Sequence, residues 1–330
     1  MGWRTAAAVV GVAMIAGPAF GWGADGHRMV AAVGMRALPS DVPAFVRAPA
    51  AQNFVAYLAP EADRQKGAGE ARDKDMDSGH FVDVSDDLTA FGGPALAALP
   101  PTREAYDTAL RAHGHTQYEA GYLPYAMAEG YQLLVKDFAY WRAAVAGGKF
   151  AKTAAAKKDF AVERDRREKI LLHDLGYWSH FIGDASQPLH ASVHFNGWGA
   201  YPNPGQYTDD HIHGPFESSY VHDYVTEAAV TQRLPAPQTC SDPALRCAGN
   251  FLIATAGQVV PLYQLEKAGA FKTKTDAGVD FTARQIARGA GELRDLVTMA
   301  WHDSAKAKIG WPEIAVTDIE AGKATPPKND

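Results

Sequence analysis

The sequence predicts an all-α fold, a single compact domain of many helices joined by long irregular loops. Apolar residues share one helical face directly after His27, at positions 30, 33, 34, 37 and 38, and a second amphipathic repeat of three- and four-residue spacings runs from 286 to 301. Alternating strand patterns are scarce, and Phe-Val-Asp-Val at 81–84 is the only short candidate. Helices therefore have to supply the core.

Two further helices are expected at 123–145 and 157–185, and the second ends before Pro188, which cannot continue a helix. Between the helices, glycine, proline or charged residues predict loops at 66–78, 86–103 and 198–205. Residues 321–330 are polar and are expected to form a loose tail. No linker divides residues 22–320, which are expected to form one domain.

The first 21 residues have the pattern of a secretory signal peptide. Arg4 precedes an apolar run at 5–17, and small residues, Ala19 and Gly21, occupy the two positions that a signal peptidase inspects. Cleavage after Gly21 would start the mature chain at Trp22 and deliver it to the periplasm or the exterior. The alternative, a membrane anchor, is disfavoured because the run is shorter than the roughly 20 residues of a spanning helix and ends at Pro18.

Composition indicates a globular protein, with 47% hydrophobic and 21% charged residues. The net charge of -6 argues against binding through a broad basic surface, although bound divalent cations would reverse the sign locally. Cys240 and Cys247, the two cysteines, lie in a proline-rich stretch, and in an exported protein a local disulfide is the expected outcome. Free thiols or a thiolate metal site are the weaker alternatives, because no second cysteine pair completes a zinc tetrad.

The strongest local signal is the segment 180–190. His180 and Asp184 are four residues apart on an expected helix, so their side chains share a face. Pro188 then ends the helix and allows His190 to return toward that end. Imidazole and carboxylate groups together suit a borderline cation such as zinc.

Other histidines and acids extend this pattern. His213 and Glu217 repeat the four-residue spacing, with Pro215 suited to a first helical turn. Further candidate ligands come from three other places in the chain: the pair His80 and Asp83, the carboxylate of Asp63, and His27 together with the new amino terminus of Trp22. Taken singly, each has a structural explanation: a surface or capping pair, a satisfied core histidine, or a solvated carboxylate.

In combination, these motifs resemble the S1/P1 nuclease family and its relatives, the bacterial zinc phospholipases C. The resemblance runs in unbroken order through Trp-Gly-x-x-Gly-His at 22–27, Asp63, His-Phe-x-Asp at 80–83, His-Phe-x-Gly-Asp-x-x-Gln-Pro-Leu-His at 180–190 and His-x-x-x-Glu at 213–217. The residues after Glu217 carry no matching motif. The resemblance implies an all-helical fold that holds three zinc ions in a cleft.

The resemblance also implies how the ligands divide among the three zinc ions. The first ion would take Asp63, His80, His180 and Asp184; the second the amino nitrogen and carbonyl oxygen of Trp22, His27 and Asp184; the third His190, His213 and Glu217. Asp184 would bridge the first two ions. Five histidines match nothing in the pattern and are expected to be structural or to lie on the surface: His113, His115, His173, His222 and His302. His194 and His211 are not expected to be ligands, because His194 departs from the Gln-Pro-Leu-His pattern and His211 has no acid four positions later. Asp210 is a candidate partner for a zinc-bound imidazole.

By this resemblance the protein would cleave single-stranded DNA or RNA to 5'-phosphorylated products. Two cations that share Asp184 would lower the pKa of a water between them and supply hydroxide. Asp63 could orient that water or accept its proton, and the sequence does not distinguish a metal ligand from a general base at this position. Phe81 and Asp83 would stack on a base and hydrogen-bond to it, unless Phe81 is a core residue and Asp83 supports a metal ligand.

Two other functions remain open. Fungal nucleases end the last motif with Asp, whereas Glu217 matches the phospholipases C, so a phospholipid is the alternative substrate. A secreted zinc-binding protein without turnover is the alternative of another class, although a storage site would close its coordination spheres. No stable protein partner is implied, and a monomer is expected.

Overall fold

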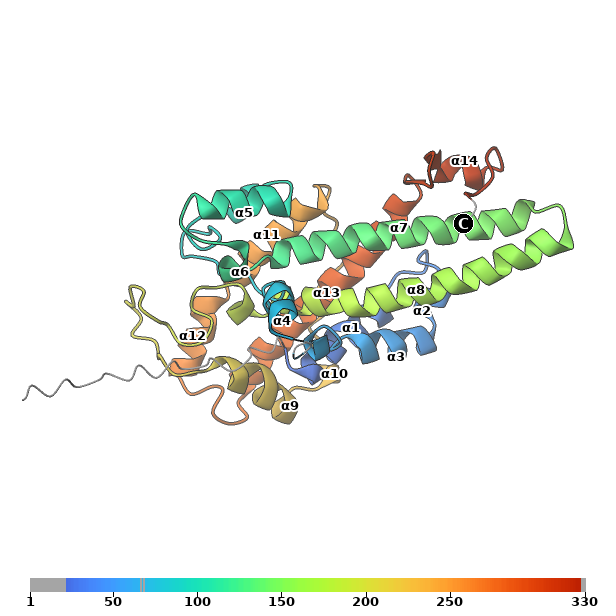
Figure 1. The fold of residues 1–330 in the computed structure, drawn as a ribbon. Helices are drawn as coiled ribbons and strands as arrows, with labels where there is room; N and C mark the ends of the chain where they lie inside the picture. The colour runs from blue at the N-terminus through green and yellow to red at the C-terminus, as the bar shows by residue number, and fades with distance from the viewer. Residues whose placement is uncertain (1–21, 66, 68, 328–330) are drawn as a thin grey trace, which may run out of the picture.

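Two long helices, α7 (Leu123–Phe150) and α8 (Ala154–Ser186), form a hairpin whose far end projects beyond the other elements (Figure 1). The computed structural model describes residues 22–65, 67 and 69–327, so the predicted signal peptide at 1–21 lies outside the described residues. The side chain of Thr153 accepts a hydrogen bond from the Ala156 N–H and caps the start of α8. Helix α8 ends at Ser186, two residues before Pro188, as predicted.

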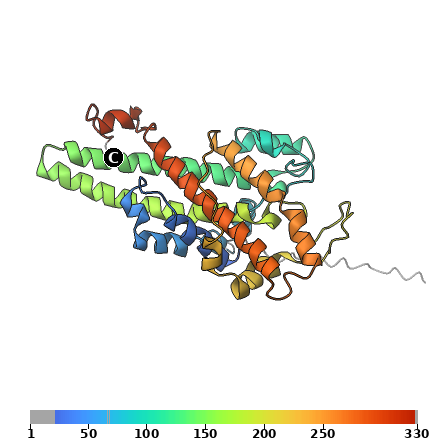
Figure 2. The same ribbon diagram turned by 180° about the vertical axis from the view of Figure 1, so that it is seen from behind.

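A third long helix, α13 (Asp276–Ser304), crosses the α7–α8 hairpin (Figure 2) and packs on α1 (Ala24–Arg36). The predicted apolar face of α13 is buried at Ile286, Ala290 and Leu293. Helix α1 approaches closely, because a Cβ on Gly34 would lie 2.8 Å from the carbonyl oxygen of Ala290. The α1, α8 and α13 helices thereby enclose the main core.

The remaining helices are shorter. They are α2 (Ala44–Arg47), α3 (Pro49–Leu58), α4 (Glu70–Asp77), α5 (Arg103–Arg111), α6 (Gln117–Ala120), α9 (Val221–Tyr224), α10 (Glu227–Thr231), α11 (Ala244–Ala256), α12 (Val259–Lys267) and α14 (Val316–Glu320). Short 3-10 turns lie at η1 (Asp63–Gln65), η2 (Leu96–Ala98) and η3 (Pro188–His190), and η4 (Pro215–Tyr220) is a π-helix. The prediction of a mostly helical single domain is confirmed.

One local prediction is wrong. Residues 70–77, expected to be a loop, form the helix α4. This helix has no buried residue, and an exposed ion pair of 2.7 Å between Glu70 and Lys74 stabilises it. Such a helix has no apolar face, so periodicity does not reveal it. The short candidate strand at 81–84, which is too brief to anchor a sheet, makes only an isolated bridge, from Val84 to Ala90.

The strands that the structure describes lie elsewhere. β1 (Lys308–Ile309) pairs antiparallel with β2 (Ile314–Ala315), and together with α14 they cover one side of α7 through a small second cluster that includes Ile309, Val316 and Ile319. Residues 321–330 were expected to form a loose tail, but Ala324 packs against this cluster. Residues 328–330 lie outside the described chain. Among the helices of the described residues, none combines the length and apolar character needed to cross a bilayer.

The predicted disulfide is present. Cys240 and Cys247 are joined, with Cα atoms 6.0 Å apart. Cys247 lies on α11, so the bridge attaches the proline-rich stretch to that helix. Disulfides are typical of oxidising compartments, and the bond is consistent with export.

Candidate metal centre

Six separate segments bring the predicted ligands together. His180 and Asp184 come from the last turns of α8, His27 from the first turns of α1, and Asp63 from η1. The other ligands lie in connecting segments, His80 after α4, His190 at η3, and His213 and Glu217 at the start of the π-helix. Their ligand atoms form three close groups, which are His27, His180 and Asp184; Asp63, His80 and His180; and His190, His213 and Glu217.

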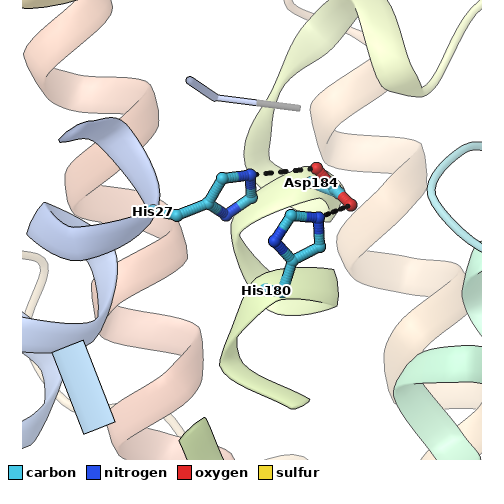
Figure 3. Close-up of side chains that lie close together, drawn as sticks. All are labelled: His27, His180 and Asp184. Carbon is cyan, nitrogen blue, oxygen red and sulfur yellow. Dashed lines mark ion pairs between the residues drawn. The ribbon is translucent and has the colours of Figure 1, made fainter. Parts of the chain in front are cut away.

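The first group lies between α1 and α8 (Figure 3). Nε2 of His27 is 3.5 Å from Oδ1 of Asp184, and Nε2 of His180 is 3.2 Å from Oδ2. The two imidazoles are stacked with centroids 3.8 Å apart. A Cβ on Gly183 would lie 2.6 Å from Nδ1 of His27, so glycine at this position allows the His27 ring to reach α8.

The second group shares His180 with the first. Nδ1 of His80 lies 2.9 Å from Nε2 of His180 and 3.1 Å from Oδ2 of Asp184, and Oδ1 of Asp63 is 3.9 Å and 3.8 Å from the two imidazole nitrogens. The two oxygens of Asp184 therefore face different partners, Oδ1 toward His27 and Oδ2 toward His80 and His180. This is the position that a bridging carboxylate needs.

The third group surrounds the carboxylate of Glu217. Oε2 of Glu217 lies 2.8 Å from Nε2 of His213 and 3.4 Å from Nε2 of His190. The Gln187 amide donates to the same oxygen (3.0 Å), and its carbonyl oxygen accepts from the Leu189 N–H. Gln187 thus links the turn that carries His190 to the π-helix that carries Glu217.

Backbone carbonyls orient two of the imidazoles. Nδ1–H of His180 donates to the Ala59 oxygen (2.8 Å), and Nδ1–H of His190 donates to the His80 oxygen (2.7 Å). A carbonyl can only accept, so Nδ1 carries a hydrogen in both rings, and in the neutral imidazole Nε2 presents its lone pair to the centre. Metal-binding histidines are oriented in this way.

Several buried ligand atoms have no hydrogen-bond partner among the described residues. They are both ring nitrogens of His27 and of His213, Nε2 of His190, Oδ1 of Asp184 and Oε1 of Glu217. Leaving so many polar atoms unsatisfied in one place would cost several kcal/mol, at roughly 1–3 kcal/mol each. Cations bound among them would satisfy these atoms, and imidazole with carboxylate is the donor set that zinc prefers, so the residues fit a zinc centre.

The protonation equilibria favour positive charge in this centre. Burial, assisted by the neighbouring His180, lowers the pKa of His27 to about 3 and keeps it in the neutral form that binds metals. Burial opposes the ionisation of Asp184, but His180 and His190 hold the pKa of its carboxyl well below the usual range. Burial also opposes charge on His190, yet Asp184 and Glu217 raise its pKa to about 9. The buried carboxylates thus attract protons or metal ions.

Trp22 lies at the edge of the centre and is fully buried. Its indole Nε1–H donates to Oγ of Ser186 (2.9 Å), two residues after Asp184. The backbone N–H of the next residue, Gly23, donates to the backbone carbonyl oxygen of Glu217 (3.1 Å). These contacts hold the start of the described chain against α8 and the π-helix. That its main-chain amino nitrogen and carbonyl oxygen bind a metal is a prediction.

A cleft of about 520 Å³ opens onto the centre. Phe81 and Asp83 line it together with His80, His190, His213 and Glu217, and burial raises the pKa of Asp83 well above its usual range. Sequence reasoning missed Phe195 and Asn196, which line the same cleft and carry no motif. Asn196 Oδ1 accepts from the His213 N–H (3.2 Å), a tertiary contact without a sequence signal.

His194 and His211, which the sequence pattern leaves out of the ligand set, belong to none of the three ligand groups. The His194 ring bonds to the Trp198 carbonyl and to Asp86, and His211 is exposed and lines the cleft. Asp210 is exposed, and within the described part of the chain its carboxylate pairs with no imidazole of the centre, so its predicted role is not supported.

Comparison of the chain with models of protein families and with curated proteins gave no match. The geometry alone therefore defines the class, a mostly helical protein with three adjacent buried groups of histidine and carboxylate ligands that could hold metal ions.

Proposed function

We propose that the protein is a zinc-dependent phosphodiester hydrolase, a nuclease that cleaves single-stranded DNA or RNA to 5'-phosphorylated products and acts after export. The observation that carries the proposal is the adjacency of three ligand groups, two of which contribute residues to the wall of one cleft. Three Zn²⁺ ions would supply Lewis acidity and a lowered pKa for bound water when present. The motif order that resembles the S1/P1 nucleases supports the choice of nuclease.

Four side chains would have distinct roles in binding and hydrolysis. Asp184 uses both carboxylate oxygens to hold two ligand groups in register, and Asp63, with an 11% exposed side chain, is placed to accept a proton at its carboxylate. Phe81 offers an aromatic face to a base in the cleft, and Asp83 a hydrogen-bonding group beside it.

One observation favours a second candidate, a zinc phospholipase C. Among the described residues that line the cleft there is neither Lys nor Arg, whereas Asp77 and Glu119 are acidic. A zwitterionic headgroup would meet less repulsion there than a long polyanion. Glu217 in the last motif agrees with this alternative.

The test is a substrate panel on the zinc-loaded protein that begins at Trp22. Single-stranded DNA and RNA, 3'-nucleotides, phosphatidylcholine and a chromogenic phosphodiester are compared with and without chelator, together with metal analysis. The proposal expects chelator-sensitive hydrolysis with nucleic acid fastest. Faster cleavage of phosphatidylcholine would select the phospholipase, and bound zinc without any hydrolysis would leave a zinc-binding protein.

A further inference from the structure

A second cavity, of about 400 Å³, lies between α7 and α8 next to the metal centre. Segment 76–81 separates it from the cleft: Met76 and Gly79 line the second cavity, while Asp77, His80 and Phe81 line the cleft. We call the second cavity the aromatic pocket, after Tyr122, Tyr177, Trp178 and Phe181 in its walls. None of these aromatic residues belongs to a ligand group of the metal centre.

The aromatic walls are held rigidly. The indole N–H of Trp178 donates to the Met127 carbonyl (3.0 Å), and a Cβ on Gly130 would lie 1.9 Å from that indole, so only glycine lets Trp178 pack against α7. Tyr177 and Phe181 pack edge to face with centroids 5.6 Å apart. Fixed aromatic faces of this kind bind planar rings at a small entropic cost.

A cation stands at the side of these rings. The Arg103 guanidinium lies 3.7 Å from the centroid of Tyr122, and its Nε–H donates to Oε1 of Gln117 (3.0 Å). In the part of the chain that the structure describes, no carboxylate forms an ion pair with Arg103, in contrast to Arg64 or Arg111. The charge of Arg103 contributes to the lowered pKa of the Asp107 carboxyl, but its terminal nitrogens are not held in an ion pair there, and a guanidinium matches phosphate geometry well.

Polar groups also reach the pocket. The Oε1 of Gln65 accepts from Arg72 (3.0 Å) and from the Tyr177 hydroxyl (3.4 Å), which leaves the Gln65 amide N–H groups as donors. Glu129 on α7 and Asp174 on α8 contribute carboxylate acceptors. Donors and an acceptor beside aromatic faces are what the edge of a nucleobase requires.

We propose that the aromatic pocket is a second nucleotide site, which binds the base among its aromatic side chains and the phosphate on Arg103 without a metal ion. The choice of a nucleotide among aromatic anions rests on the proposed function. In a nuclease, such a site would hold a released mononucleotide or a neighbouring nucleotide of the strand. The pocket chemistry itself requires only an aromatic ring and one anionic group.

The probe is adenosine 5'-monophosphate, titrated by calorimetry into the zinc-loaded protein that begins at Trp22. The wild type is expected to bind it at two sites, the cleft and the aromatic pocket. Phe81→Ala should weaken binding in the cleft, and Arg103→Gln should weaken binding in the aromatic pocket at least tenfold. Arg111→Gln on the same helix is the matched control, because Arg111 is exposed and its partner Asp107 lies outside the pocket. Zinc content should be unchanged in both arginine variants.

A filled pocket gives a second readout. Ala126→Phe should abolish the binding that depends on Arg103, while circular dichroism reports whether the variant is folded. Unchanged affinity in Arg103→Gln, or a single site that Phe81→Ala removes completely, overturns the proposal. If the protein binds the nucleotide through Arg103 but has no phosphodiesterase activity, the proposed function is refuted and the nucleotide site stands. If it hydrolyses phosphodiesters but shows no binding that depends on Arg103, the nucleotide site is refuted and the proposed function stands.

Discussion

Nε2 of His180 lies 2.9 Å from Nδ1 of His80. Because the hydrogen of His180 is on Nδ1, bonded to the Ala59 carbonyl, its Nε2 points a lone pair at the second ring. Nδ1 of His80 either donates a hydrogen to this lone pair or to Asp184, or presents a second lone pair, and the carboxylate of Asp184 stands within 3.2 Å of both nitrogens. The arrangement is therefore one that bound positive charge stabilises.

Removal of metal should destabilise the fold. Ions that bind only the native state stabilise it by about 4 kcal/mol when present at a thousand times their Kd, so chelation should lower the Tm by at least about 5 °C. Thermal unfolding followed by circular dichroism, with and without chelator, measures this. Added Zn²⁺ should restore the Tm; identical melting curves would show that the centre does not contribute to stability.

Asp184→Asn should reduce bound zinc and hydrolysis together. The substitution removes the carboxylate that faces both His27 and the His80–His180 pair, so activity should fall more than about 100-fold, since loss even of an outer partner of a ligand costs 10- to 100-fold. Zinc per chain and the rate on a chromogenic diester are measured. Asp165→Asn, exposed on the same helix, is the control; full activity in Asp184→Asn would exclude the bridging role.

A chain that still carries Gly21 before Trp22 should be less active than the chain that begins at Trp22. An amide nitrogen is a poor ligand, and the predicted site of the second ion depends on a free amine beside His27 and Asp184. Purified long and short forms are compared for zinc content and rate, with one fewer tightly bound zinc expected in the long form. Equal zinc content and equal activity would contradict this prediction.

Phe81→Ala should raise KM for single-stranded nucleic acid by about 5- to 100-fold and change kcat little, because stacking on an aromatic ring is worth about 1–3 kcal/mol per base. Phe54→Ala, exposed on α3, is the control of similar size. Steady-state kinetics separates the two constants. An unchanged KM would place Phe81 outside the base site.

Glu292 should make the protein less stable as the pH rises from about 4.5 to 7. Burial raises the pKa of Glu292 to about 7, with Asp295 adding to the effect and Arg288 opposing it, so the folded state binds more protons than the unfolded state in this window. Glu292→Gln should gain up to about 3 kcal/mol over the wild type above pH 7 and almost nothing below pH 4.5. Denaturant titrations at the two pH values test this, with exposed Glu104→Gln as control.

The long helices and the central ligand motif could be predicted from the sequence. Amphipathic repeats reveal α1, α7, α8 and α13 because each buries one face, and the four-residue spacing of His180 and Asp184 follows from helix geometry. The disulfide followed from having two nearby cysteines. Helix α4 escaped because it buries no side chain, so no periodic pattern marks it.

Sequence by itself determined which residue types could bind a cation and which pairs share a helical turn. Only the tertiary structure decided that His27 stacks on His180, that Asp63 and His80 reach Asp184, and that Phe195 and Asn196 line the cleft. These contacts join residues that are far apart in the chain; His27 and His180, for example, are separated by 153 positions. Their distances depend on how helices pack, through close approaches such as Gly183 to His27, and packing is a property of the whole core that no local pattern encodes.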